Sequence, residues 1–215
     1  MIDSISNILN KNGIYHRTEK NVILTRRTKI RIPSFNLDLA YLTGVIVGDG
    51  AMVQTIRKRG GHHYVLSIFS NSKKYLEYLN TLFVKYFNHK GTFYKDKRHK
   101  VYTLLIQAAP IFFYFVNIDL PIGKSGEEYV PAIIKSNSSY FKEYIAGLCD
   151  TDGHVNSSNR IYLKQKSKNL LSEIVDFLNK EKVRCSYPKV NYTNGKPYYY
   201  ILMDFKLPLR LKAPL

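Results

Sequence analysis

Two stretches of this chain, Tyr41–Gly50 (YLTGVIVGDG) and Tyr144–Gly153 (YIAGLCDTDG), align with each other without gaps. The offset between them is 103 residues in a chain of 215 residues. Similarity at a fixed offset indicates a duplicated structural unit. Each stretch ends in Asp-Gly, so the sequence predicts two copies of one module that carry an aspartate, Asp49 or Asp152, at the same place.

The residues after each stretch repeat one order of elements: a strand, a helix that begins after a serine N-cap, and two more strands. The first copy offers Val65–Ser70, Lys73–Phe87 after Ser72, Gly91–Tyr94 and Val101–Gln107. The second offers Arg160–Gln165, Lys168–Glu181 after Ser167, Ser186–Tyr192 and Tyr198–Phe205, with a hairpin turn at Asn194-Gly195. With a further strand before the first of these and a short closing helix, each copy becomes an αββαββα module of the α+β class, with helices on one side of an antiparallel sheet.

The repeat divides the chain into four segments. We expect a basic N-terminal extension at 1–37, a first module at 38–117, a linker at 118–138 and a second module at 139–215. The extension has seven basic and two acidic residues, with a short helix candidate at Ile5–Asn10. It is either an arm that contacts DNA or a disordered, soluble tail, and the sequence does not decide between them.

One face of each repeated helix carries residues at intervals of four. They are Ala40, Gly44 and Gly48 in the first copy and Glu143, Gly147 and Thr151 in the second. A glycine inside a helix costs about 1 kcal/mol, so Gly44 and Gly147 call for a compensating close contact. Each helix is the natural partner of the other, and packing side by side would bring Asp49 and Asp152 together at the C-terminal helix ends.

Two carboxylates at helix C-termini repel each other and the negative end of the helix dipole. A divalent cation removes that conflict, and Mg²⁺ (or Mn²⁺) suits a site with few carboxylates and open positions for water and phosphate oxygens. Such ions can activate water and stabilise the leaving oxygen of a phosphodiester. One Asp-Gly alone would indicate only a tight turn at a helix end, whereas two copies with matching flanks favour catalysis.

The strand before each second helix has an apolar parity that ends in a polar residue, Ser70 in the first copy and Gln165 in the second. That side chain should lie beside the helix ends, where it could orient water or phosphate. The opposite parity in the second copy is Arg160, Tyr162, Lys164 and Lys166. This face suits a DNA groove, although any half-exposed strand shows such alternation. In the first copy, Arg57, Lys58 and Arg59 occupy the tip of a longer strand-turn-strand.

The formal net charge of +17 points to a polyanionic partner, because small soluble domains usually carry a net charge of magnitude about 2 to 8. Nucleic acid fits better than a membrane, since the basic residues are scattered and no apolar run reaches the roughly 18 residues that span a bilayer. The start of the chain lacks a secretion signal pattern. Two cysteines are too few for a disulfide scaffold. We therefore expect an intracellular protein, in the cytoplasm or an organelle matrix.

Leu42–Gly50 (LTGVIVGDG) and Ile145–Gly153 (IAGLCDTDG) resemble the paired motif of the LAGLIDADG homing endonucleases, in the single-chain form that carries both copies. The resemblance runs from about residue 38 to residue 207. The second copy is close to the family pattern, including the lead-in Val130-Pro131. The first copy matches through its glycines and Asp49.

The resemblance implies two pseudo-twofold-related modules, with the motif helices at their interface and the sheets forming a DNA-binding saddle. It implies that Asp49 and Asp152 bind the catalytic metal, assisted by the backbone carbonyls of Gly48 and Thr151. It further implies a monomer that hydrolyses both strands of double-stranded DNA across the minor groove, leaving short 3′ overhangs, within a long pseudo-palindromic or asymmetric site.

The resemblance also implies that a glutamine organises solvent at the position of Gln165, where the first copy has Ser70 instead. A lysine near the last strand of a module matches Lys206, whereas the first copy has Ala109 there. Lys74 is a candidate substitute. These departures put equal cutting of the two strands in doubt and leave both metal ligands in place.

The expected function is Mg²⁺-dependent double-strand cleavage by an intron-encoded homing endonuclease. The main alternative is an RNA maturase, or another non-cleaving nucleic-acid binder, on the same scaffold. Retention of both aspartates favours the enzyme, since a pure binder needs no metal carboxylates.

Overall fold

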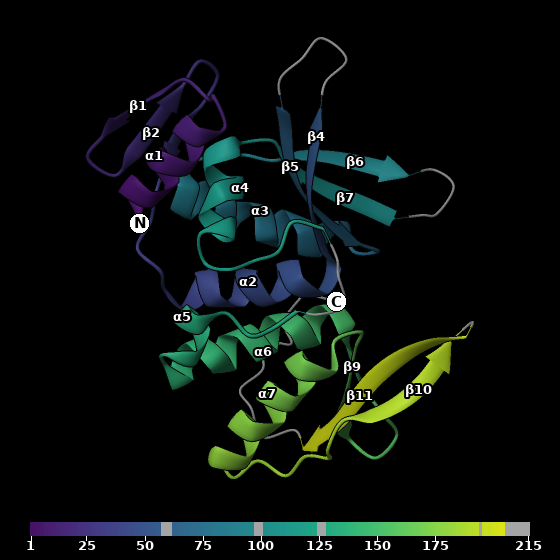
Figure 1. The fold of residues 1–215 in the computed structure, drawn as a ribbon. Coiled ribbons are helices and arrows are strands. Elements are labelled where there is room, and N and C mark those ends of the chain that lie inside the picture. Colours follow the sequence, from purple (N-terminus) through teal and green to yellow (C-terminus); the bar gives the residue numbers. More distant parts are fainter. Residues whose placement is uncertain (57–61, 97–100, 124–127, 194, 205–215) are drawn as a thin grey trace. The chain divides into compact units, whose positions relative to one another are not determined.

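The computed structural model describes residues 1–56, 62–96, 101–123, 128–193 and 195–204 (Figure 1). These residues form two compact units. Unit 1 contains Met1–Asn36 and Gly50–Gly123, and unit 2 contains Leu37–Asp49 and the described residues that follow 127. Helices and antiparallel sheets occur in both, which confirms the predicted α+β class.

Unit 1 begins with a small subdomain and continues with the first repeated module. The subdomain consists of α1 (Ile2–Lys11), β1 (His16–Glu19), β2 (Val22–Thr25) and β3 (Lys29–Arg31), with the strands in the order β1-β2-β3. The module consists of β4 (Gly50–Ile56), β5 (His62–Ser70), α3 (Lys73–Phe87), β6 (Thr92–Asp96), β7 (Val101–Ile106) and α4 (Ala109–Val116). Its antiparallel sheet has the order β4-β5-β7-β6.

The N-terminal segment is therefore folded, and the interpretation of it as a disordered tail is wrong. Ile5 and Leu9 of α1 are fully buried, as are Ile23 of β2 and Ile30 of β3. Helix α1 packs against α4 of the first module, beside the three-stranded sheet (Figure 1). The strands have only three or four residues each, which is too short for a clear alternation of polar and apolar side chains to identify them in the sequence.

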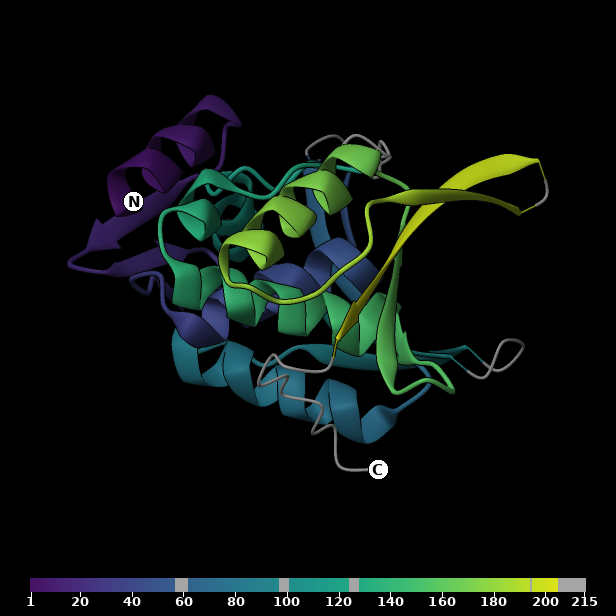
Figure 2. The same cartoon turned by 90° about the horizontal axis from the view of Figure 1, so that it is seen from below.

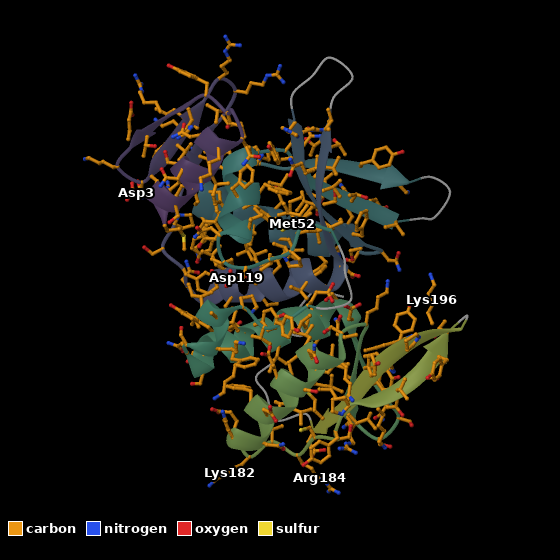
Figure 3. The ribbon with its side chains drawn as sticks, viewed as in Figure 1. Asp3, Met52, Asp119, Lys182, Arg184 and Lys196 are labelled. Carbon is orange, nitrogen blue, oxygen red and sulfur yellow. The ribbon has the colours of Figure 1, made fainter. Side chains whose placement is uncertain are left out.

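Unit 2 contains both motif helices. Its elements are α2 (Leu37–Asp49), α5 (Ala132–Lys135), α6 (Ser138–Asp152), β8 (Gly153–Val155), β9 (Arg160–Gln165), α7 (Lys168–Lys180), β10 (Lys189–Thr193) and β11 (Lys196–Asp204). The antiparallel sheet has the order β10-β11-β9-β8. The short helix α5 lies within the predicted linker. The β10–β11 hairpin projects away from α6 and α7 in both views (Figure 1 and Figure 2). Lys196 lies near the tip of this hairpin (Figure 3).

Serine caps fix the starts of the second helices in both copies. The Ser72 hydroxyl accepts a hydrogen bond from the Tyr75 amide at 3.2 Å, and the Ser167 hydroxyl accepts one from the Leu170 amide at 3.2 Å. Helix α3 has the predicted bounds, and α7 ends one residue earlier than predicted. Both N-caps predicted from the sequence are confirmed.

The closing helix of the repeat is described only in the first copy. The first copy closes with α4, whose apolar sequence APIFFYFV is almost entirely buried, as a closing helix requires. The closing helix predicted for the second copy would follow Phe205 and so lies outside the described residues. No helix in the described ranges combines the length and apolar character that crossing a membrane requires.

Candidate metal and nucleic-acid site

Helices α2 and α6 pack against each other through their glycines. A Cβ atom at Gly44 would lie 2.1 Å from the Tyr144 carbonyl oxygen, and one at Gly147 would lie 2.2 Å from the Tyr41 carbonyl oxygen. Both distances are far below any real Cβ contact, so only glycine allows this approach. The compensating contact expected from the sequence is therefore present, and each helix supplies it to the other.

The approach continues to the C-terminal ends of the helices, where Asp49 and Asp152 are the last helical residues. A Cβ atom at Gly48 would lie 2.0 Å from the Thr151 hydroxyl oxygen and 3.1 Å from Oδ2 of Asp152. The Asp152 carboxylate therefore lies against the backbone of the residue that precedes Asp49. The glycine at position 48 thus allows the two carboxyl-bearing ends to meet.

Both aspartates line one cavity of about 340 Å³ in unit 2. The rest of its lining is Val47, Gly48, Glu128, Lys164, Gln165, Lys166, Thr193 and Tyr198. Carboxylate and backbone oxygens with open space beside them fit Mg²⁺, which takes one or two carboxylates and keeps positions for water and phosphate. The described residues contain no group of three or more acidic, histidine or cysteine side chains that could hold a metal. A structural Zn²⁺ site needs four such ligands.

Gln165 joins the Asp152 side of the cavity to the sheet. Its side-chain amide Nε2 donates a hydrogen bond to Oδ2 of Asp152 at 2.6 Å. On β9, Ile161 and Leu163 are buried, and Gln165 continues their parity toward the helix end. The bond fixes the orientation of the Asp152 carboxylate. Gln165 therefore lies beside the helix end, as strand parity led us to expect. A catalytic role for Gln165 remains a prediction.

Two lysines of β9 and its end share one aromatic ring at this cavity. Nζ of Lys164 lies 4.2 Å from the centroid of the Tyr198 ring, and Nζ of Lys166 lies 6.0 Å from it. Nζ of Lys164 also lies 3.5 Å from the Thr193 hydroxyl oxygen. Cation–π contacts of this kind stabilise by about 0.5–1 kcal/mol at exposed sites. Tyr198 thus holds two ammonium groups near the carboxylates.

Sequence reasoning missed Tyr198 and Thr193, because they are brought to the site by strand pairing. Tyr199 of β11 pairs with Gln165 of β9, which places Tyr198 at the cavity end of the ladder. Thr193 follows through the β10–β11 hairpin, where it pairs with Lys196. The alternation around Tyr198 was a signal of a strand but gave no register, and register alone decides which side chain reaches the cavity.

The same side of this sheet carries a row of aromatic and basic side chains, which we call the β9 face. It comprises Tyr162, Lys164 and Lys166 with His154, Tyr198 and Tyr200. The Tyr162 and Tyr200 rings stack with centroids 4.7 Å apart, and His154 lies 4.7 Å from Tyr162 on the other side. Burial, followed by the neighbouring Tyr200, raises the pKa of Tyr162. Arg160 differs from the other basic residues because its Nε lies 3.1 Å from a carboxylate oxygen of Asp204.

The remaining predicted residues belong to unit 1 or lie outside the described residues. Ser70 ends β5, and its hydroxyl accepts a hydrogen bond from the Ser72 amide at 3.1 Å. Lys74 is exposed in the first turn of α3. Both are in unit 1, whereas the aspartates are in unit 2, so their catalytic roles remain predictions. Arg57, Lys58, Arg59 and Lys206 lie outside the described residues.

A polar contact between the motif helices was not anticipated. The Tyr41 hydroxyl donates to Oδ2 of Asp150 at 2.6 Å, and the Tyr41 side chain is almost fully buried. Its counterpart Tyr144 is fully buried, and among the described residues its hydroxyl has no hydrogen-bond partner. Burial first, and then the charges of Glu173 and Glu128, raise the pKa of Tyr144.

Comparison with known proteins agrees with this geometry. Residues 140–203 match the family model of the LAGLIDADG-like domain. The matched segment contains the second of the two motif copies, Tyr144–Gly153. This confirms the resemblance proposed from the two motifs.

Solved structures of single-chain LAGLIDADG homing endonucleases share the fold. I-DmoI in complex with DNA and calcium is 22% identical, with 77% of this chain and 82% of that chain covered and a TM-score of 0.60. I-DmoI with DNA and manganese is 20% identical, with 84% and 100% covered and a TM-score of 0.60. The LAGLIDADG homing endonuclease I-LtrWI bound to target DNA is 14% identical, with 84% and 85% covered and a TM-score of 0.54.

One relative by sequence is an uncharacterised protein of Methanocaldococcus jannaschii. It is 21% identical over 187 residues, which cover 82% of this chain and 66% of that protein. The chain therefore spans slightly less than two thirds of that relative.

Proposed function

We propose that this LAGLIDADG-fold protein is a divalent-metal-dependent, site-specific DNA endonuclease that makes a double-strand break in a long, asymmetric target. One observation carries the proposal: Asp49 and Asp152 end two helices whose glycine contacts hold them together, and both line the same cavity. The similarity to homing endonucleases whose structures contain DNA and calcium or manganese supports it. Hydrolysis across the minor groove with short 3′ overhangs belongs to the same proposal.

In this mechanism, Asp49 and Asp152 would hold Mg²⁺, with the backbone carbonyls of Gly48 and Thr151 as further oxygen donors. When bound, Mg²⁺ supplies Lewis-acid activation of water and neutralises charge at the phosphodiester. Gln165 keeps the Asp152 carboxylate in one orientation through its 2.6 Å hydrogen bond. Such a supporting bond matters because the ligands of a metal site lose affinity when their own partners are removed.

The lysines at the cavity act on the substrate. Lys164 and Lys166 place positive charge beside the carboxylates, and the Tyr198 ring restricts where their ammonium groups lie. These charges attract the phosphodiester, whose negative charge increases during hydrolysis, and electrostatic stabilisation at that position lowers the barrier. In our proposal Lys206 adds to this charge in the second copy. In the first copy Lys74 supplies the charge, and Ser70 has a smaller role than Gln165.

The β9 face binds DNA in this proposal. Lys164 and Lys166 would contact phosphates or base edges, while the stacked rings of Tyr162 and Tyr200 provide a stiff support for them. Arg160 contributes less charge, since Asp204 partly neutralises it. The tip residues Arg57, Lys58 and Arg59 would perform the corresponding role in the first copy.

Cleavage of a plasmid library with randomised inserts tests the proposal. Purified protein with Mg²⁺ should linearise a subset of plasmids whose inserts share one long sequence, and end sequencing should show 3′ overhangs. The Asp49→Asn and Asp152→Asn variants should bind the selected sequence without cutting it. Tight, sequence-specific binding without cutting by the unaltered protein would instead support the non-cleaving binder, and preference for intron RNA would support the maturase.

A further inference from the structure

A second cavity, of about 630 Å³, lies entirely within unit 1. Its lining comes from the N-terminal subdomain, the start of β5 and the residues around the start of α4. Its polar lining includes Arg26, Arg27, His62, His63, Thr25 and Thr28. None of the described residues that line it is acidic. The cavity therefore presents cationic groups and hydrogen-bond donors with no carboxylate to compete for them.

The arginines are held on a tightly bonded turn between β2 and β3. The Thr25 hydroxyl accepts hydrogen bonds from the amides of Thr28 at 3.1 Å and Arg27 at 3.3 Å. The Thr25 amide donates to the Thr28 carbonyl at 2.9 Å. Arg26 and Arg27 at the tip are exposed, and within the described residues neither forms an ion pair. Their guanidinium groups are therefore available to a ligand.

The opposite wall is also built from ordered contacts. Nδ1 of His62 lies 3.2 Å from the Gln54 side-chain amide. The Tyr64 hydroxyl donates to Oδ1 of Asn12 at 3.1 Å, which ties β5 to the loop after α1. The Tyr64 ring packs against Phe113 of α4, with centroids 4.8 Å apart. The Tyr64–Asn12 bond joins the N-terminal subdomain to the repeated module, and the other two contacts order the module's side of the cavity.

We infer that this cavity binds a phosphate group of the nucleic-acid backbone, so that the N-terminal subdomain adds a contact outside the two repeated modules. A guanidinium group matches two phosphate oxygens at once, and histidine adds hydrogen-bond donors. The inference rests on the proposed function for the identity of the polyanion. His62 and His63 begin β5, the strand that follows the tip assigned to DNA in that proposal.

Salt dependence of DNA binding tests the inference, because each neutralised phosphate contributes about 0.9 to the slope of log K against log salt. The full chain without Mg²⁺ would be titrated with a duplex of about 40 base pairs at several salt concentrations. The Arg26→Ala/Arg27→Ala double variant should lower the slope by about 1 to 2. Lys11→Ala/Lys29→Ala is the matched control, since both residues are exposed, belong to the same subdomain, form no ion pair within the described residues and do not line the cavity.

The control removes the same formal charge and should change the slope by less than half as much. Equal slopes for both double variants, or no change in the cavity variant, would overturn the inference. Titration with inorganic phosphate tests whether the ligand is instead a free phosphate. If the arginine variant abolishes phosphate binding but leaves the DNA slope unchanged, the cavity binds free phosphate and the inference is overturned.

The readout is binding, so it is independent of the proposed cleavage. Wild-type protein that binds the duplex but never cuts it would contradict the proposed function and leave the slope comparison valid. Wild-type protein with no affinity for the duplex would overturn both. Urea denaturation of each variant shows whether the fold is retained.

Discussion

The two motif helices are alike where they contact each other and unlike where their side chains meet other groups. At the crossing, Gly44 and Gly147 approach the opposite backbone equally closely, with hypothetical Cβ distances of 2.1 and 2.2 Å. Near the ends the equality is lost. Tyr41 donates to Asp150, but the first copy has Val47 at the position equivalent to Asp150, and the hydroxyl of Tyr144 has no partner among the described residues.

The same contrast separates the strand ends. Gln165 bonds to Asp152, whereas its counterpart Ser70 accepts a bond from the backbone of Ser72. The close contact between the two helix backbones requires a glycine in both helices, because a Cβ atom on either one would overlap the opposite backbone. The side chains around the aspartates are under no such constraint. The metal ligands can therefore stay duplicated while the groups around them diverge.

The largest effect should be common to both copies. Asp49→Asn and Asp152→Asn each remove one negative charge from the cavity with little change in size. Each should slow cleavage by more than about 100-fold, which is the most that loss of a supporting residue typically causes. DNA binding should be retained. Single-turnover cleavage and binding titrations measure this. A large loss in only one variant would break the likeness of the two copies.

Gln165→Ala and Ser70→Ala should differ. Loss of the 2.6 Å bond to Asp152 should reduce metal affinity or cleavage by about 10- to 100-fold. Ser70→Ala should have a much smaller effect, since its hydroxyl bonds to the neighbouring backbone. Rates measured separately on the two DNA strands provide the readout, with Mg²⁺ titration to separate affinity from rate. Equal losses would show that Ser70 serves as the glutamine's equivalent.

Gly44→Ala and Gly147→Ala should both destabilise the protein. The added methyl group would overlap the opposite backbone, and overpacking of this kind costs about 1–3 kcal/mol. The intrinsic helix preference of alanine offsets about 1 kcal/mol. Urea denaturation measures the free energy of unfolding, with Ser139→Ala, an exposed position on α6, as the control. Stability at or above wild type would contradict the close helix crossing.

The smallest effect should distinguish the two tyrosines. Tyr41→Phe removes a hydrogen bond to a carboxylate and should lower the free energy of unfolding by about 1.5 kcal/mol. Tyr144→Phe removes a buried hydroxyl that lacks a described partner and should leave stability unchanged or raise it. Thermal and urea unfolding of the two variants, measured side by side, give the difference. Equal destabilisation would reveal a partner for the Tyr144 hydroxyl.

Local patterns predicted the repeated elements well. Capping serines and apolar residues at helical spacing placed α3 with its exact bounds, and alternation placed β9 in the same way. The small-residue spacing predicted the contact between α2 and α6. Each of these signals is a spacing of residues that are close in sequence, which is why it can be recognised without a structure.

Individual side-chain contacts that depend on strand register or on a partner in another helix were not predicted. Tyr198 reaches the cavity through the register of β11 with β9, and the Tyr41–Asp150 bond joins residues of different helices. The folded N-terminal subdomain was missed because its strands are very short. Its arginine turn becomes part of a cavity only when β5 and α4 are placed beside it.

Helix α2 belongs to unit 2, although the residues on both sides of it belong to unit 1. The compact units therefore do not correspond to consecutive halves of the chain. A fragment that ends before residue 128 contains Asp49 but not the helix against which α2 packs, and a fragment that begins there contains Asp152 without its partner. During synthesis, the carboxylate pair can assemble only after the second copy has left the ribosome.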